Sequence, residues 1–365
     1  MGKIQERISS IENELSTAKY NKATQKAFGV LKAQLAKLKE TVVKRASTGK
    51  SDSGWFVKKS GDASVVLLGF PSVGKSTLLN VLTSSKSKVA AYAFTTLTVI
   101  PGMMEYKKAK IQILDVPGIV QGAAAGSGRG REVLAMVRNS DLMLILIDAL
   151  HPEHHQAILD EVYETGIRVN QQPPVVKIVK RSRGGLDIGS TVPLTHITKE
   201  TITAVMKEFK IANADVLIRT DITVEKLIDA IDGTCKYIPA ITVVSKMDLA
   251  TPEQMKLIKE TIKPDVFISA EKNTNIIQLK DTIFNALRFI RLYLKEVNKK
   301  ADLEEPLVLR KGATIRTLCE QLHRDFVKKF KYAKIWGTSA KFPGQQFRDL
   351  DKILNDGDIV ELHIR

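Results

Sequence analysis

An eight-residue segment, residues 69–76, constrains this chain more than any other, because it matches G-x-x-x-x-G-K-[ST], the pattern of a phosphate-binding loop. The apolar residues 63–68 before it are typical of a buried parallel strand, and residues 77–82 after it favour a first helix. In that context the loop N–H groups and the helix N-terminus face phosphate. The predicted phosphate-binding residues are Gly69, Phe70, Pro71, Ser72, Val73, Gly74, Lys75, Ser76 and Thr77.

Strand and helix patterns alternate around this loop and predict an α/β domain. Apolar runs predict further strands at residues 110–115, 141–148, 240–244 and 265–268. The spacing of apolar residues between Asn275 and Val297 predicts one long closing helix. Residues 168–238 interrupt the pattern with a proline pair, a basic run and mixed strand-like and helix-like segments. We therefore expect a small α+β domain inserted between two strands of the main sheet.

The first 45 residues contain two stretches of apolar residues at helical spacing, which predict an antiparallel helical hairpin. The chain has a formal charge of +16, and residues 1–60 hold 13 Lys and Arg against 5 Asp and Glu. The outer face of the hairpin is expected to be basic, with Lys19, Lys22, Lys26, Lys32, Lys37, Lys39, Lys44 and Arg45. Such a face either contacts RNA or is only solvated, and the sequence leaves both interpretations open.

The last 65 residues differ in pattern from the rest. They show, in order, a strand, a helix, a strand, a loop and a terminal strand, which is compatible with a β-grasp fold. Basic and aromatic residues alternate here, at Lys328, Lys329, Phe330, Lys331, Tyr332, Lys334 and Trp336. Lysines neutralise phosphates and exposed aromatic rings stack on bases. Phe330 and Trp336 are alternatively core residues, and for Trp336 we expect the core role.

Three residues of the predicted site suit nucleotide phosphates and their metal ion. Lys75 is expected to reach the β- and γ-phosphates, and the Ser76 hydroxyl to bind Mg²⁺. Asp115 follows a predicted strand, and an aspartate at a strand end can hold the water shell of Mg²⁺. Lys75 is therefore assigned to catalysis as well as binding, and Ser76 and Asp115 to the metal.

Two further segments suggest nucleotide-dependent switches. Val116, Pro117, Gly118 and Ile119 continue from Asp115, and the Gly118 N–H is expected to donate to the γ-phosphate. Residues 121–130 are rich in glycine, which suits a segment that orders only with γ-phosphate. Thr96, with Thr95 as the alternative, is expected to complete the Mg²⁺ shell and to contribute to catalysis.

Two segments after apolar strands predict recognition of the base. The first segment is Ser245, Lys246, Met247 and Asp248. The Asp248 carboxylate can accept from both N1–H and the 2-amino group of guanine, which adenine lacks, while the Lys246 stem covers the ring. Ser269 and Ala270 form the second segment, where a backbone N–H can point at guanine O6. These signals favour GTP, and an ATPase remains the third interpretation.

These motifs together resemble the developmentally regulated GTP-binding proteins of eukaryotes and archaea, in the Obg superfamily of translation-factor-class GTPases. The matching segments are residues 69–79, 92–97, 115–119 and 331–337. The resemblance covers essentially the whole chain. It implies a P-loop GTPase domain with an inserted domain similar to the second domain of a small-subunit ribosomal protein, an N-terminal helical hairpin and a C-terminal TGS domain. The implied boundaries are 1–50, 60–167, 168–238, 239–295 and 296–365.

The chain departs from the usual GTPase motifs at two positions. Ser245 stands where asparagine is usual, and its shorter side chain is not expected to bridge base site and phosphate loop as an asparagine amide does, which would lower guanine affinity. Ile119 stands where many GTPases carry a water-orienting glutamine, so intrinsic hydrolysis should be slow. Activation by K⁺ is left open, because Ser72 occupies the position where several potassium-activated GTPases carry asparagine.

We therefore interpret the chain as a slowly hydrolysing GTP switch that acts with ribosomes in cytoplasmic translation. The alternative is an RNA- or ribosome-binding scaffold with a mainly structural nucleotide site. The resemblance implies ribosomal RNA or tRNA and a zinc-finger regulatory protein as partners. No apolar run reaches the ~20 residues of a membrane span, and the two cysteines, Cys235 and Cys319, fit a reducing compartment.

Overall fold

The computed structural model describes residues 2–18, 21, 24–47, 60–83, 100–116, 136–297 and 299–364. Its contacts divide the chain into two compact units. One unit combines Met1–Gly54 with Gly166–Tyr237, and the other combines Trp55–Thr165 with Ile238–Arg365. Each unit has its own hydrophobic cores. Among the residues described, no helix is both long enough and apolar enough to cross a membrane.

The second unit contains a six-stranded sheet in the order β11-β10-β4-β1-β3-β2. All neighbours pair in parallel except β2 and β3, which form an antiparallel hairpin at one edge. The strands are β1 (Ala63–Leu68), β2 (Ile100–Tyr106), β3 (Ala109–Asp115), β4 (Leu142–Asp148), β10 (Ala240–Ser245) and β11 (Val266–Phe267). The five strands predicted from apolar runs are all confirmed. Because they are parallel, their carboxyl ends meet at one edge of the sheet.

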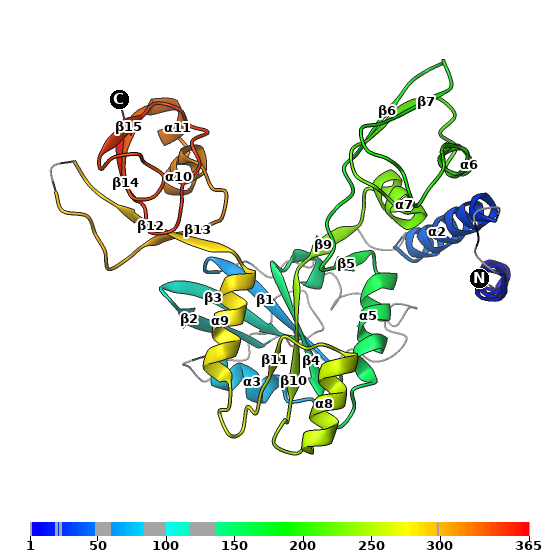
Figure 1. Cartoon of the computed structure of the whole chain (residues 1–365), viewed down its shortest axis with the longest axis horizontal. Helices are drawn as coiled ribbons and strands as arrows, with labels where there is room; N and C mark the ends of the chain where they lie inside the picture. Colours follow the sequence, from blue (N-terminus) through cyan, green and yellow to red (C-terminus); the bar gives the residue numbers. More distant parts are fainter. Residues whose placement is uncertain are drawn as a thin grey trace. The chain divides into compact units, whose positions relative to one another are not determined.

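Helices cover both faces of this sheet, as Figure 1 shows. They are α3 (Lys75–Leu82) and α9 (Ile276–Ala286) on one face, and α5 (His154–Glu164) and α8 (Pro252–Thr261) on the other. Burial on both faces explains why β1 and β4 are apolar along their whole length. The first helix begins at Lys75, two residues earlier than predicted, so Lys75 and Ser76 lie in its first turn.

The long helix expected between Asn275 and Val297 is wrong in its second half. Helix α9 ends at Ala286, and after Arg288, whose φ is +51°, the chain continues as strand β12 (Phe289–Leu294). Ile290, Leu292 and Leu294 alternate with polar residues and face a separate core, which is the two-residue period of a strand.

Strand β12 belongs to a five-stranded sheet in the order β13-β12-β16-β14-β15, formed otherwise by the last 65 residues. The other strands are β13 (Leu307–Arg310), β14 (Phe330–Trp336), β15 (Gln345–Phe347) and β16 (Ile359–Ile364). Helix α10 (Ile315–Leu322) fills one side with Ile315, Leu318 and Cys319, and α11 (Phe326–Lys329) follows it. The predicted order of strand, helix, strand and terminal strand is confirmed.

Phe330 packs against this C-terminal core, whereas the expected core role of Trp336 is wrong. Trp336 is half-buried, and the Lys295 ammonium lies over its ring at 4.8 Å. The reason is its position in β14, where it alternates with the fully buried Ala333 and Ile335 and so points to the opposite side of the sheet.

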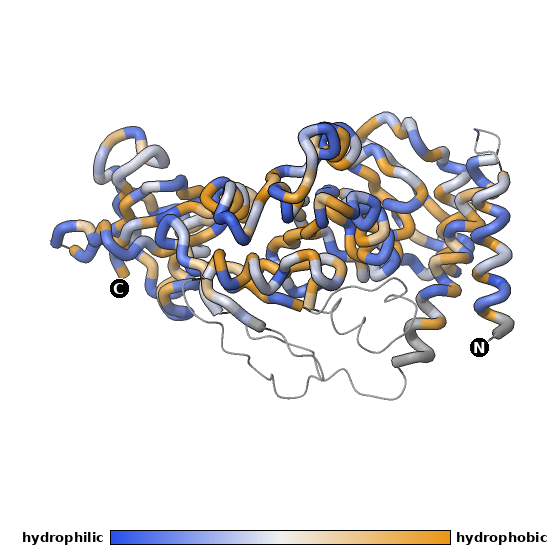
Figure 2. Tube along the Cα trace, turned by 90° about the horizontal axis from the view of Figure 1, so that it is seen from below, coloured by the Kyte–Doolittle hydropathy of each residue, from blue (hydrophilic) through white to orange (hydrophobic). Residues whose placement is uncertain are grey.

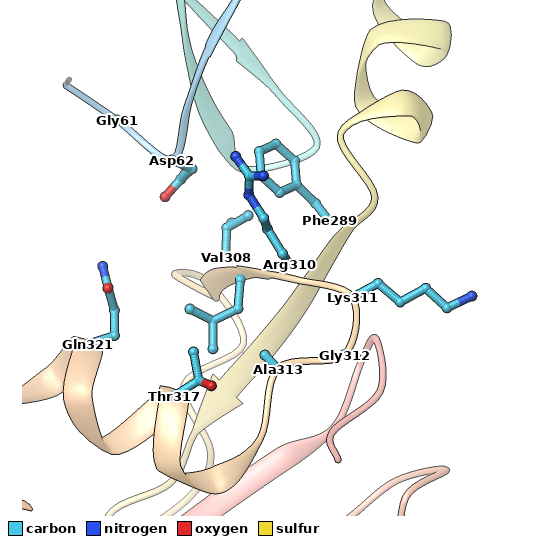
Figure 3. A pocket seen from close by; sticks show the side chains of 11 residues that line it. Gly61, Asp62, Phe289, Val308, Arg310, Lys311, Gly312, Ala313, Thr317 and Gln321 are labelled. Carbon is cyan, nitrogen blue, oxygen red and sulfur yellow. The ribbon is translucent and has the colours of Figure 1, made fainter. Parts of the chain in front are cut away.

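A cavity of about 410 Å³ lies where the residues before β1 approach strand β13 and helix α10. Figure 3 shows Arg310 extending beside Phe289 on the side where Asp62 lies, while Lys311 points away. Arg310 forms an ion pair with Asp141, whose carboxylate also accepts from the backbone N–H and hydroxyl of Ser64. None of the residues lining this cavity belongs to the predicted nucleotide-binding set.

The first unit joins the N-terminal helices α1 (Gly2–Thr17) and α2 (Gln25–Ser47) to the inserted segment. Figure 2 shows hydrophobic and hydrophilic residues alternating along both helices, as in amphipathic helices. The inserted segment has a three-stranded sheet of β6 (Val176–Lys180), β8 (Ala214–Ile218) and β7 (Leu186–Ser190), with helices α6 (Lys199–Glu208) and α7 (Val224–Asp232). Ala33 and Ala36 of α2 pack into the core of this segment.

The N-terminal hairpin does not present all of its expected lysines on an outer face. Lys32 forms an ion pair with Glu225 of α7, and Lys37 pairs with Glu208 of α6 at 3.3 Å. Lys39 pairs with Glu12 of α1 at 3.0 Å. The expectation of a uniformly outward basic face is wrong for these three, because α2 lies against the inserted segment on one side and α1 on another.

The inserted segment is closed at its base by a short ribbon of β5 (Ile167–Val169) and β9 (Lys236–Ile238). Beside it, Arg168 donates two hydrogen bonds to Asp229, at 2.8 and 2.7 Å, and both side chains are buried. The Cys235 thiol and the Tyr237 hydroxyl donate to the same carboxylate at 3.2 Å. Burial, together with Asp229, raises the pKa of Cys235 to about 12, so this thiol stays protonated at neutral pH.

Candidate nucleotide-binding site

The phosphate-binding loop connects β1 to α3 and has the backbone that the motif requires. Gly74 caps α3 with φ at +95°, a conformation that favours glycine, and Ser72 also has a positive φ of +62°. A Cβ on Gly69 would lie 2.7 Å from the carbonyl oxygen of Leu146, so only glycine fits next to β4. The loop therefore stays close to the sheet and leaves its N–H groups for an anion.

Lys75 lies beneath this loop and is 8% exposed. Its ammonium group donates to the carbonyl oxygens of Gly69 and Phe70, at 3.0 and 2.9 Å. Burial lowers the pKa of Lys75, and the negative charge of Asp115 partly opposes this shift. A buried cation held by neutral carbonyl groups would gain most from an anionic ligand such as a phosphate.

Asp115 ends β3 opposite the start of α3, and its Oδ2 accepts a hydrogen bond from the Ser76 hydroxyl at 2.6 Å. Burial raises the pKa of Asp115, while the Ser76 hydrogen bond and the Lys75 charge oppose the shift. A hydroxyl and a carboxylate side by side are the oxygen ligands that Mg²⁺ prefers. The pairing of Ser76 with Asp115, predicted from strand-end position alone, thus fits a magnesium site beside the loop.

The residues predicted to read the base lie at the ends of β10 and β11. A hydrogen bond from the Ser269 hydroxyl lowers the pKa of Asp248, and Lys272, with its Nζ 3.5 Å from Asp248 Oδ2, acts in the same direction. The Met247 N–H donates to the carbonyl oxygen of Ile268 at 3.1 Å, which joins the two loops. Asp248 is therefore a charged acceptor next to Ser269 and Ala270, as guanine recognition requires.

Ser245 bridges the base side and the phosphate loop, contrary to the expectation from its length. Its hydroxyl lies 2.8 Å from the carbonyl oxygen of Val73 and 3.1 Å from that of Ile147. The bridge forms because β10 pairs directly with β4, which places Ser245 opposite Asp148 at the end of the sheet and close to the loop. An asparagine is not needed to make this contact.

Several predicted site residues lie outside the described part of the chain. They are Thr96 and its alternative Thr95, and Pro117, Gly118 and Ile119 after β3. Val116 is described and buried. The structure therefore brings together the phosphate loop, Asp115, the segment 245–248 and Ser269–Ala270 at one edge of the sheet, and the switch assignments stay predictions.

Two residues near the site were not predicted from the sequence. Asp148 ends β4, and its Oδ2 lies 2.8 Å from the ammonium of Lys246. His154 begins α5 and stacks on Phe70 of the phosphate loop, with ring centroids 4.1 Å apart and planes inclined by 21°. Asp148 carried a usable signal, because it follows an apolar strand as Asp115 does.

The parallel sheet, the phosphate loop with its lysine and the paired Ser76 and Asp115 define a P-loop GTPase, joined here to a TGS domain. Family descriptions match in the same order: a "50S ribosome-binding GTPase" over residues 64–181, the "C-terminal region of MMR_HSR1 domain" over 183–289 and a "TGS domain" over 290–364.

Full-length relatives identify the family more closely. The "Uncharacterized GTP-binding protein MJ1326" of Methanocaldococcus jannaschii is 52% identical, covering 99% of this chain and 93% of its own. The "Developmentally-regulated GTP-binding protein 2 homolog" of Dictyostelium discoideum is 43% identical, covering 98% and 99%. The chain belongs to the family of developmentally regulated GTP-binding proteins.

A solved structure also aligns with part of the chain. The FeoB G-domain from Methanococcus jannaschii covers 62% of this chain and 99% of its own, at 18% identity and a TM-score of 0.35. That TM-score is too low to carry an argument about this chain.

Proposed function

We propose that this GTP-binding protein hydrolyses GTP slowly and acts as a switch on cytoplasmic ribosomes. The observation that carries the enzymatic part is the preformed phosphate side of the site. Lys75 is buried under the loop, and Ser76 and Asp115 lie 2.6 Å apart beside it. Family membership supports guanine nucleotide as the ligand, and Asp248 beside Ser269 supplies the acceptor that distinguishes guanine from adenine.

In the proposed reaction each group of the chain has a separate task. The loop N–H groups and the Lys75 ammonium bind the β- and γ-phosphates and stabilise negative charge on them. Ser76 and Asp115 would hold Mg²⁺, which supplies charge neutralisation between the phosphates when bound. Asp248 and Lys246 orient the base, and the Ser245 hydroxyl connects both sides through Val73.

The proposed rate is slow because the motif supplies no group that orients water. Ile119 follows Gly118 in sequence, where many GTPases carry glutamine. We expect turnover below about 10⁻² s⁻¹, the intrinsic rate of a GTPase that carries its own arginine finger. Activation must then come from a ribosome, a partner or a monovalent cation, and a zinc-finger regulatory protein is the partner class that the family resemblance implies.

The ribosomal part of the proposal has separate support. A family described as ribosome-binding GTPases matches residues 64–181, and the net charge of +16 favours a polyanionic partner. Because Lys32, Lys37 and Lys39 are engaged in ion pairs, the exposed lysines of the TGS domain are the better candidates for phosphate contacts. These are Lys328, Lys329 and Lys331.

The enzymatic part is tested by the turnover of purified full-length protein with GTP and with ATP, with and without ribosomes, in KCl and in NaCl. We expect slow turnover of GTP, no turnover of ATP and a rate that rises at least about tenfold with ribosomes. Equal turnover of the two nucleotides would contradict the guanine assignment. Ribosome binding without any turnover would favour the scaffold, and a rate that differs between KCl and NaCl would show a cation requirement.

The ribosomal contact is tested by co-sedimentation across a salt series. Replacing Lys328, Lys329 and Lys331 by alanine should weaken binding and reduce the slope of log K against log salt by about 0.7–0.9 for each lost phosphate contact. A triple variant of exposed lysines on α8 and the following turn, Lys256→Ala, Lys259→Ala and Lys263→Ala, is the matched control. Unchanged binding of the TGS variant would exclude these three lysines as the anchor.

A further inference from the structure

Asp148 occupies the last position of β4, directly opposite Ser245 in the register with β10. The side chain is 8% exposed, and its orientation is fixed by the turn that follows. Oδ1 accepts from the Leu150 N–H at 3.0 Å, and the Asp148 carbonyl oxygen accepts from the His151 N–H at 3.0 Å. One carboxylate oxygen is thus occupied by the turn, and the other is directed elsewhere.

The second oxygen, Oδ2, lies 2.8 Å from the ammonium of Lys246. Lys246 has a φ of +56°, so its backbone is held in the left-handed region at the end of β10. Its side chain is 34% exposed, whereas that of Asp148 is 11% exposed. The ion pair therefore fixes a long, partly exposed lysine stem from the buried side.

The same turn also contacts the phosphate loop. His154 stacks on Phe70, and the His154 N–H donates to the carbonyl oxygen of His151 at 3.3 Å. The turn from Asp148 to His154 thus lies behind both sides of the nucleotide site. Contact with Phe70 limits the freedom of the turn, and so of the Asp148 carboxylate.

We propose that Asp148 is a positioning residue for guanine, acting through Lys246. The Lys246 stem can cover a base bound at Asp248 only in some of its conformations, and the ion pair holds it in a restricted set before the nucleotide arrives. Preordering removes part of the entropy cost of binding. The inference rests on the proposed function, because it takes guanine nucleotide as the ligand of this site.

The test is a double-mutant cycle on the full-length protein, with GTP and pyrophosphate as probes. Asp148→Asn keeps an oxygen for the Leu150 N–H but removes the charge that holds Lys246. We expect GTP affinity to fall about five- to tenfold and pyrophosphate affinity to change less than about twofold, because pyrophosphate has no base. In a Lys246→Ala background the same substitution should cause no further loss of GTP affinity.

Two more variants complete the experiment. Asp160→Asn removes an exposed carboxylate from α5 and should leave both affinities unchanged. Asp148→Glu keeps the charge, should recover part of the GTP affinity, and carries the cycle if Asp148→Asn does not fold.

Equal losses of GTP affinity in the wild-type and Lys246→Ala backgrounds would overturn the inference, because they would show a merely structural role. A parallel loss of pyrophosphate affinity would overturn it as well. If the wild-type protein binds pyrophosphate but not GTP, the proposed function itself fails. If it binds GTP and the cycle is additive, only the role of Asp148 fails.

Discussion

The phosphate side and the base side of the nucleotide site are built from the same strand ends but differ in how their charges are balanced. On the phosphate side, Lys75 and Asp115 are both buried, and burial shifts the pKa of each toward its neutral form. On the base side, Lys246 pairs with Asp148, and Asp248 is charged beside Ser269 and Lys272.

The difference shows where binding energy is expected to come from. Charged groups on the phosphate side are desolvated and only partly compensated, so a ligand that brings phosphate and Mg²⁺ relieves a cost already present in the fold. The base side is already compensated by its own ion pairs, so a base gains mainly orientation and selectivity. We therefore expect substitutions on the phosphate side to affect affinity most, and those on the base side to affect selectivity.

The largest effect is expected for Lys75→Ala. The variant removes the cation under the loop, and charge-assisted hydrogen bonds to phosphate contribute ~1.5–3 kcal/mol each. GTP and GDP affinities should both fall about 100-fold, measured by fluorescence titration with labelled nucleotides. Lys256→Ala, on the exposed face of α8, is the control and should bind normally. A loss of less than about threefold would contradict the importance given to the phosphate side.

Asp248→Asn is expected to change selectivity more than total binding capacity. The amide can no longer accept from both nitrogens of guanine, so GTP affinity should fall about 10–100-fold, a loss of ~1.4–3 kcal/mol. Xanthine carries a carbonyl oxygen where guanine carries the amino group, so the amide can donate to it and XTP should bind better than to the wild type. Competition with GTP and XTP measures both. Unchanged preference for GTP would move base recognition away from Asp248.

Ser245→Ala tests the contact that joins the two sides. Loss of the hydrogen bond to the Val73 carbonyl should weaken GTP binding about three- to tenfold, since a neutral hydrogen bond contributes ~0.5–1.5 kcal/mol. Pyrophosphate binding should weaken as well, because Val73 belongs to the phosphate loop. Ser245→Asn should retain binding. If only GTP binding changes, the bridge serves the base side alone.

The smallest effect is expected for the pH dependence of stability without nucleotide. Because the folded-state pKa of Asp115 is raised, the favourable contribution of the protonated form is lost as pH rises from about 4 through the folded-state pKa. Asp115→Asn removes this titration, so its melting temperature should exceed that of the wild type by a margin that grows with pH in this range. Calorimetry of both proteins at several pH values measures that difference. A margin that shrinks with pH would show that burial does not penalise the charged carboxylate.

The sequence predicted the elements whose signals are local. An apolar strand, a glycine-rich loop and a polar residue at a strand end each lie within about ten residues, so the six-stranded sheet and most of the nucleotide site followed from pattern. Strand β12 was missed because its two-residue period continued directly from the helical period of α9, with only Leu287 and Arg288 between them.

Contacts distant in sequence could not be predicted in this way. The partners of Lys32 and Lys37 lie 193 and 171 residues later, so the lysines looked free. The bridge from Ser245 to Val73 depends on the neighbouring positions of β10 and β4, and a side-chain length alone gave the wrong expectation. Strand order and helix packing decide such contacts, and neither is encoded in a local motif.

The shared core of α2 and the inserted segment has a consequence for how the chain is made. Gln25 of α2 donates to the carbonyl oxygen of His196, 171 residues later. Synthesis proceeds at about 5–20 residues per second, so the apolar side of α2 waits roughly 10–30 seconds for its partner. During that interval the earliest segment of the protein is the one most in need of protection, although its fold is among the simplest in the molecule.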